Sequence, residues 1–374
     1  MRTQTQMRSL LVALAALFAA LAIGACGDDD DDGGDGGEAA DGGGGTIAFL
    51  LPETQTARYE ALDKPLFEAK VAELCPDCEV QYQNADQDPA KQQSQVEAAV
   101  TEGVDVMVLD PVDSTTAGAL ASRAAQSDIP VISYDRLILD TDALDYYVAF
   151  DSLEVGRQQA TALSERLVED GNDTGPIVKI NGDPKDNNAT LFSQGSTEVF
   201  EDEGVEIAQE YDTPDWLPEN AQREMEQAIT ATGAEQIKGV YAANDGTAGG
   251  AIAAMKANGI DPTEIPVTGQ DAELTAVQRI IAGEQFMTVY KPIQPLAEAA
   301  AELAVAVANG EEPPADLVTS ETDNGSEAVP TAVIDTVAVT QDNLQDTIIA
   351  DEVYPVNEIC TGQYQKACAD AGIE

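Results

Sequence analysis

The chain has 374 residues, with 18 Lys and Arg against 69 Asp and Glu, and a formal net charge of −51 at pH 7. This length accommodates two domains of ordinary size, and the strong negative charge argues against nucleic acid and anionic lipid as partners. Histidine is absent, which excludes imidazole metal ligands and catalytic triads with a histidine base.

Residues 1–25 have the pattern of a bacterial lipoprotein signal peptide. Arg2 and Arg8 precede an apolar run from Leu10 to Ala22, which is too short to be a membrane-spanning helix. The sequence Ile-Gly-Ala-Cys that ends at Cys26 matches a lipobox. We therefore expect cleavage before Cys26, a lipid on its thiol and an extracytoplasmic location; the alternative is a plain secretory signal.

Residues 26–45 continue with a run of Gly and Asp. Glycine has no side chain to pack and the Asp carboxylates repel one another, so this segment is expected to be an extended tether. Asp28, Asp30 and Asp32 precede Gly33 as in a calcium loop, but the twelfth position is Ala39 rather than Glu. We expect no metal site here.

From residue 46 onward, short aliphatic strands alternate with amphipathic helices of about 12–18 residues. This alternation is typical of βαβ units, with parallel sheets covered by helices on both faces, and predicts an α/β fold. Ten strands in one open sheet would be unusual, so two lobes of about five strands each are expected. The predicted strands are 46–51, 79–83, 105–110, 130–135, 146–150, 176–180, 205–211, 238–243, 265–270 and 286–290.

Polar side chains follow most of these strands directly, at the sheet edge where ligands bind in such folds. Carboxylates, amides and guanidinium groups can make paired hydrogen bonds to the neighbouring hydroxyls of a sugar. An aromatic ring can cover its C–H face. The residues that carry this interpretation are Arg58, Tyr59, Arg136, Asp186, Asn188, Trp216, Asn244, Asp271 and Lys291.

Simpler explanations exist for several of these residues. Asn188 would cap a helix from Ala189, as Asp245 would cap the helix after residue 245. Arg136 would lie on the surface, and Trp216 would pack between the lobes.

Several motifs resemble the xylose-binding branch of the type I periplasmic sugar-binding proteins of ABC importers. The resemblance runs from about residue 47 to residue 348. The motifs are SYDRLI, DPKDNNATLF, DWLPENA, NDGTAGGAI, GQDAEL and IAGEQFMTVYKPI.

The resemblance implies two Rossmann-like lobes joined by three crossing segments that close over a pyranose. The first lobe would comprise residues 46–150 and 291–328, and the second residues 151–290 and 329–374, so that the crossings fall near Phe150, Tyr290 and Val329. The family's pocket positions fall on eight of the nine residues above. The ninth, Tyr59, stands where the family has Trp, which leaves open whether xylose, ribose, arabinose, glucose or galactose fits.

Four cysteines follow the signal segment, an even number that favours disulfides in an exported chain. The Cys75-Pro76-Asp77-Cys78 segment is also compatible with a redox pair or half of a zinc site. We expect two local disulfides, Cys75–Cys78 and Cys360–Cys368.

Together these features predict a monomeric sugar-binding lipoprotein that delivers D-xylose or a similar monosaccharide to an ABC permease. It would touch the membrane only through its lipid and would need no cofactor. A sugar-sensing ectodomain for a membrane receptor is an alternative. A secreted sugar-acting enzyme using Asp186 and Asp271 is another, but flanking Arg and Lys residues would hold both carboxyls ionised and leave no acid.

Overall fold

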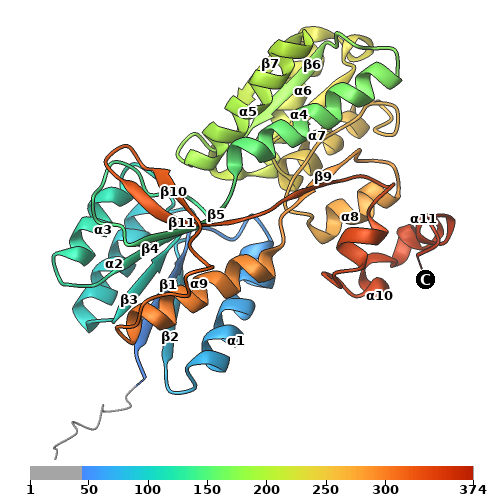
Figure 1. The fold of residues 1–374 in the computed structure, drawn as a ribbon. Helices are drawn as coiled ribbons and strands as arrows, with labels where there is room; N and C mark the ends of the chain where they lie inside the picture. The colour runs from blue at the N-terminus through green and yellow to red at the C-terminus, as the bar shows by residue number, and fades with distance from the viewer. Residues whose placement is uncertain (1–43, 374) are drawn as a thin grey trace, which may run out of the picture. The chain divides into compact units, whose positions relative to one another are not determined.

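Seven strands form one sheet in the computed structural model, which describes residues 44–373 (Figure 1). The strand order is β10-β11-β5-β4-β3-β1-β2. Only the β10–β11 pair is antiparallel. The strands are β1 (Thr46–Leu51), β2 (Glu79–Asn84), β3 (Val106–Leu109), β4 (Val131–Tyr134), β5 (Tyr146–Phe150), β10 (Ser320–Asp323) and β11 (Ala328–Ile334).

Helices cover both faces of this sheet because successive strand side chains point to opposite faces. In β1, Phe49 and its alternate neighbours pack in one core with α1 (Lys64–Leu74) and α9 (Ile293–Ala308). Leu50 packs in the other core with α2 (Pro89–Glu102) and α3 (Ala117–Ala125). We call this sheet with its helices the first lobe.

A second set of strands has the order β7-β6-β8 and is parallel throughout. The strands are β6 (Ile177–Asn181), β7 (Ile207–Asp212) and β8 (Gly239–Ala242). One face packs against α4 (Ser152–Glu169) and α5 (Asn187–Glu203), and the other against α6 (Pro218–Thr232) and α7 (Asp245–Ala257). We call these elements the second lobe, together with α8 (Leu274–Ile281), a two-stranded sheet and the C-terminal segment. The α/β prediction is confirmed.

The strand predicted over residues 265–270 does not form. The segment makes only isolated bridges, from Val267 to β8 and from Gln270 to β9 (Thr288–Tyr290). A regular ladder is interrupted because Pro266 has no N–H to donate. In addition, the Ala242 N–H donates to the side-chain oxygen of Thr268 (2.9 Å) instead of a carbonyl.

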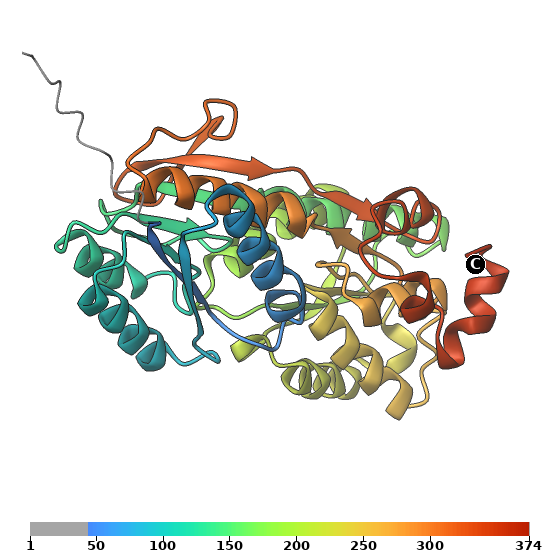
Figure 2. The same cartoon turned by 90° about the horizontal axis from the view of Figure 1, so that it is seen from below.

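Three strands were not predicted from the sequence: β10, β11 and β12 (Val337–Val339). β12 pairs antiparallel with β9, so the chain passes from the first lobe to the second between β11 and β12 (Figures 1 and 2). We expected this crossing near Val329. It follows Ile334 instead, because Thr331–Ile334 pair with β5.

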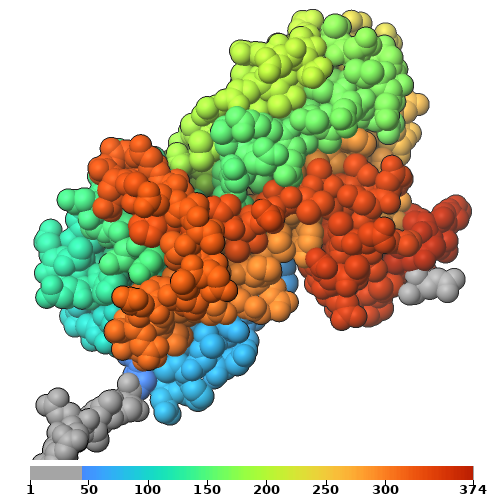
Figure 3. Space-filling view, viewed as in Figure 1, coloured from blue at the N-terminus to red at the C-terminus, as the bar shows by residue number. Residues whose placement is uncertain are grey.

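The C-terminal segment beyond β12 packs on α8. Leu344, Ile348 and Ile359 share a core with Val277 and Ile280. This segment contains α10 (Val356–Ile359) and α11 (Gln365–Asp370), and its red surface is seen in Figure 3.

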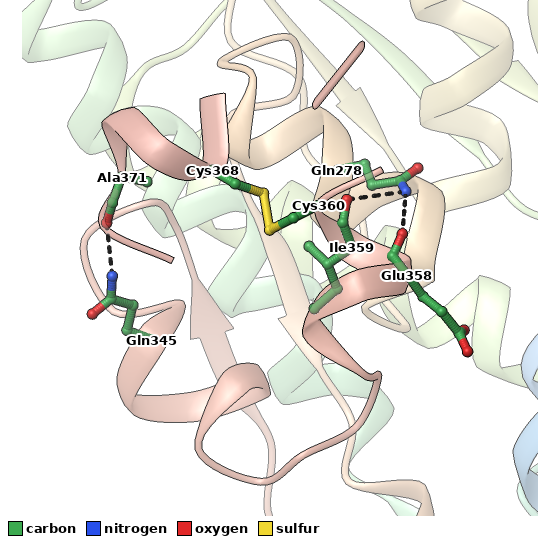
Figure 4. The surroundings of a disulfide bond; sticks show 7 residues. All are labelled: Gln278, Gln345, Glu358, Ile359, Cys360, Cys368 and Ala371. Atoms are coloured by element: carbon green, nitrogen blue, oxygen red, sulfur yellow. Dashed lines mark hydrogen bonds between the residues drawn. A yellow bond between two sulfur atoms is a disulfide. The ribbon is translucent and has the colours of Figure 1, made fainter. Parts of the chain in front are cut away.

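The structure joins Cys360 to Cys368 between these two helices, and the Gln278 amide donates to the carbonyls of Glu358 (2.9 Å) and Ile359 (3.2 Å) (Figure 4). Cys75 and Cys78 are joined after α1.

Some predictions lie outside the described residues: the signal peptide, the lipidation of Cys26 and nearly all of the tether. Among the residues from 44 to 373, no helix has the length and apolar character needed to span a membrane.

Candidate ligand-binding site

All nine side chains predicted to bind a ligand line one cavity, to which the carboxyl ends of strands from both lobes contribute. The cavity measures about 20 Å³, enough for roughly one water molecule. Its lining consists of Thr56, Arg58, Tyr59, Asp135, Arg136, Asp186, Asn188, Phe192, Trp216, Asn244, Gln270, Asp271 and Lys291.

Arg58 lies at the first-lobe side of the cavity and is bound by carboxylates of that lobe. Its guanidinium donates to Asp63 (3.1 Å) and to Asp135 (2.5 Å). The Tyr59 hydroxyl also donates to Asp135 (2.9 Å), and the Arg58 guanidinium lies 4.6 Å from the Tyr59 ring centroid. Burial acts to raise the pKa of Asp135, but Arg58, Lys291 and Arg136 outweigh it and hold that pKa below its usual value.

Arg136 connects the two lobes through Asp186. The Nε of Arg136 lies 3.0 Å from Oδ2 of Asp186, which also accepts from the Trp216 indole (3.2 Å). All three side chains are buried. Burial raises the pKa of Asp186, although Arg136 opposes the shift.

Asp271 and Lys291 form a further ionic contact of the cavity, at 2.8 Å. Asp271 lies 3.6 Å from Arg58 Nε, so a second-lobe carboxylate faces cations from two directions. Its φ of 92° is in the left-handed region, where few side chains other than Asn and Asp occur. The Lys291 ammonium also lies 5.2 Å from the Phe150 ring centroid.

Asp186, rather than Asn188, caps α5. Its Oδ1 accepts from the Asn188 N–H (2.8 Å), and the helix begins at Asn187, two residues before the predicted start. The Asn188 amide is therefore free to reach the first lobe, where it donates to the Asp135 carbonyl (3.1 Å). Similarly, Asn244 rather than Asp245 caps α7.

The loop after β6 meets the first lobe through several further hydrogen bonds. The Ser114 N–H donates to the Lys185 carbonyl (3.0 Å), and the Ser114 hydroxyl accepts from the Asn187 N–H (3.1 Å). The Gln87 amide donates to Asp183 (3.4 Å). These contacts close the cavity, because they join the lobes beside it.

Four lining residues were missing from the predicted set: Thr56, Asp135, Phe192 and Gln270. A signal existed for three of them. Asp135 and Gln270 each directly precede a predicted residue at a segment end, and Phe192 lies one helical turn after Asn188. Thr56 carries no such signal, because it lies in an irregular loop.

Five buried polar atoms of the lining lack a hydrogen bond of acceptable geometry. They are Nε of Arg58 and of Arg136, Oδ1 of Asn188 and of Asp271, and Oε1 of Gln270. Buried polar groups are normally satisfied. Two donors and three acceptors around one cavity suit a ligand that carries several hydroxyl groups.

No cluster of side chains with the composition of a metal site occurs among the described residues. The lining is rich in carboxylates, but each of Asp135, Asp186 and Asp271 faces an Arg or Lys.

Comparison with known proteins identifies the family. The sequence profile of the periplasmic binding protein domain matches residues 47–312. The chain belongs to this family. The chain is similar to the D-xylose-binding periplasmic protein of Escherichia coli strain K12, with 39% identity over 84% of this chain and 92% of that protein.

Two further relatives have different ligands in their names. The multiple sugar-binding periplasmic receptor ChvE of Rhizobium radiobacter is 32% identical over 74% of this chain and 82% of its own length. The carbohydrate transporter solute-binding protein of Chloroflexus aurantiacus, solved with D-glucose, has a TM-score of 0.74 and 32% identity, covering 83% of this chain and 97% of that one. These relatives are binding proteins, which confirms the prediction of a periplasmic binding protein rather than an enzyme.

Proposed function

We propose that this protein is the extracytoplasmic binding component of an ABC importer for D-xylose or a similar monosaccharide. The observation that carries the proposal is one cavity lined by buried donors and acceptors of both lobes, in which Asn188 Oδ1 and Gln270 Oε1 accept no hydrogen bond. Xylose-binding and glucose-binding relatives support a monosaccharide as the ligand.

In this proposal the nine lining residues predicted from sequence hold the sugar. Arg58, Arg136 and Lys291 donate to its hydroxyls, and Asp186 and Asp271 accept from them; each such charged hydrogen bond contributes about 1.5–3 kcal/mol. Trp216 and Tyr59 cover C–H faces, with Asn188 and Asn244 completing the polar lining.

A pyranose is larger than the closed cavity, so binding requires the lobes to separate. Opening breaks contacts such as Arg136–Asp186 (3.0 Å) and Ser114–Lys185 (3.0 Å), and the sugar replaces part of them on closure. Crossings after β5, after β9 and between β11 and β12 form the hinge of the two proposed lobes. An ABC permease would recognise the closed shape.

The remaining parts of the proposal concern the chain outside this cavity. Cys26 carries the lipid that holds a monomeric protein at the outer face of the cell membrane, and residues 27–45 act as the tether. The two disulfides, Cys75–Cys78 and Cys360–Cys368, fit an exported chain.

Isothermal titration calorimetry against a panel of neutral monosaccharides tests the proposal. The panel contains D-xylose, D-ribose, L-arabinose, D-glucose and D-galactose. We expect one of them to bind with one site per chain. Failure of all five to bind the folded protein would refute the proposal.

A sugar-sensing ectodomain is the second candidate, because one relative is described as a receptor. Deleting the gene distinguishes the two: loss of uptake of the bound sugar indicates transport, whereas normal uptake with loss of a transcriptional or chemotactic response indicates sensing.

A further inference from the structure

Three carboxylates surround the single guanidinium of Arg136. Asp186 Oδ2 lies 3.0 Å from Nε, Asp110 Oδ1 lies 3.7 Å from the same Nε, and Glu53 Oε1 lies 3.6 Å from Nη2. All four side chains are less than 5% exposed. The closed cavity thus places three acidic groups around one basic group.

Of these three carboxylates, Asp110 has the fewest hydrogen-bond donors to offset the cost of its burial. It is fully buried, and neither of its side-chain oxygens receives a hydrogen bond. A buried carboxylate without donors is costly. It does not line the cavity, so the ligand contacts described above do not account for it.

The backbone of Asp110 is fixed within the first lobe. Its N–H donates to the Leu50 carbonyl (2.9 Å), and its carbonyl accepts from the Gln92 amide (2.8 Å). Glu53 is in the same lobe, whereas Asp186 belongs to the second. Separation of the lobes removes Asp186 from Arg136 and leaves Asp110 and Glu53 beside it.

Closure also brings together two faces that are both acidic. The first-lobe face contains two cations, Arg58 and Arg136, and four carboxylates. The second-lobe face contains two further carboxylates, and Lys291 lies at the crossing after β9. The six carboxylates are Glu53, Asp63, Asp110, Asp135, Asp186 and Asp271. Because like charges disfavour each other's ionisation, closing costs energy that the sugar contacts must offset.

We propose that Asp110 is a positioning residue: it holds Arg136 while the lobes are apart and opposes their closure, so that it lowers the affinity for the sugar. This inference rests on the proposed function. Removing the Asp110 charge should therefore tighten binding, the opposite of what a ligand-contacting residue would show.

Proton uptake provides an independent readout. Burial raises the pKa of Asp110 in the closed form well above its usual value, with Arg136 opposing and Asp135 adding to the shift. Opening takes Asp186 away from Arg136 and lets water into the cavity, so the pKa of Asp110 is lower in the open form than in the closed form. At a pH between the open-form and closed-form pKa values of Asp110, closure of the lobes is accompanied by protonation of Asp110. The affinity for the sugar therefore falls as pH rises through that interval. The charged and titratable groups near Asp110 are Arg58, Tyr59, Asp135, Arg136, Tyr147 and Asp186.

The test compares Asp110→Asn with the wild-type protein by calorimetry between pH 5 and 8. The probe is the sugar that binds in the panel above, with D-xylose used first. At pH 7.5 we expect Asp110→Asn to bind roughly tenfold more tightly, the effect of one pKa unit, and to show a flatter pH dependence. Asp128→Asn is the matched control, because Asp128 is exposed in the same lobe; its affinity should equal that of wild type.

The inference is overturned if Asp110→Asn binds the sugar as tightly as wild type or more weakly. It is also overturned if the variant binds more tightly but its affinity varies with pH as that of wild type does. Asp110→Leu provides a second variant if the amide destabilises the fold, which thermal unfolding reports. A further measurement uses the wild-type protein alone. The binding enthalpy, measured by calorimetry in buffers of different ionisation enthalpy, should reveal proton uptake on sugar binding. Absence of proton uptake also overturns the inference. If wild type binds no monosaccharide, the proposed function fails instead.

Discussion

Replacement of Asp271 by Asn tests how much of the sugar affinity depends on charge in the cavity. Asn has the shape of Asp and accepts the left-handed backbone that residue 271 adopts (φ 92°). The substitution removes the charge that faces Lys291 Nζ at 2.8 Å and Arg58 Nε at 3.6 Å.

The magnitude follows from the closed cavity. Removing one partner of a buried ion pair costs about 3–5 kcal/mol, because the other charge is left unpaired. In the open form Lys291 would be solvated, so this cost falls on closure alone. Asp271→Asn should therefore weaken sugar binding by roughly two to three and a half orders of magnitude, at about 1.4 kcal/mol per tenfold.

Calorimetric titration of the variant measures this loss, and thermal unfolding without sugar checks the fold. Asp140→Asn serves as the matched control, because Asp140 is also left-handed (φ 54°) but exposed. We expect near-normal unfolding for both variants and normal affinity for the control. If Asp271→Asn binds within threefold of wild type, the assignment of Asp271 to the binding site is refuted.

Three further predictions concern the indole, the tyrosine and pH. Sugar binding should change the fluorescence of Trp216, the single tryptophan; an unchanged spectrum during calorimetrically proven binding would place the ring away from the ligand. Tyr59→Phe should lower the free energy of unfolding by about 1 kcal/mol, since it removes a hydrogen bond to Asp135 within the first lobe; an unchanged melting temperature would show that this bond does not contribute to stability. Burial raises the pKa of Asp245 to about 7, so the folded protein binds more protons than the unfolded chain. Its contribution to stability is therefore largest below about pH 4 and is lost as pH rises toward 7. Asp245→Asn should flatten the fall in melting temperature between pH 5 and 8, and an identical slope in both proteins would contradict this.

Strands that are buried apart from their first residue, β1 and β5, were the easiest to predict from the sequence. β1 and β5 match their predicted ranges because each is a short apolar run next to a polar loop. Residues 265–270 are also a short apolar run next to a polar loop. Their strand pairing is interrupted, because Pro266 has no N–H and the Thr268 side chain accepts the hydrogen bond that a backbone carbonyl would otherwise accept. β10 was missed because its four residues are polar and mostly exposed.

The cavity residues were predictable because parallel strands bring their carboxyl ends to one edge. That rule identified Arg58, Arg136 and Asp271 without knowledge of the contacts between them. It could not identify Thr56, which precedes Arg58 in an irregular loop, or show that Asp186 caps α5 while Asn188 reaches Asp135. The contact from Asn188 to Asp135 depends on how the two lobes meet, which local sequence patterns do not encode.

A crystal structure of the protein grown with the sugar selected by calorimetry tests the central claim most directly. We expect one monosaccharide between Arg58 and Arg136 on one side and Asp186 and Asp271 on the other, with hydroxyls that donate to Oδ1 of Asn188 and Oε1 of Gln270. A sugar bound elsewhere on a chain whose cavity keeps its present ion pairs would contradict it.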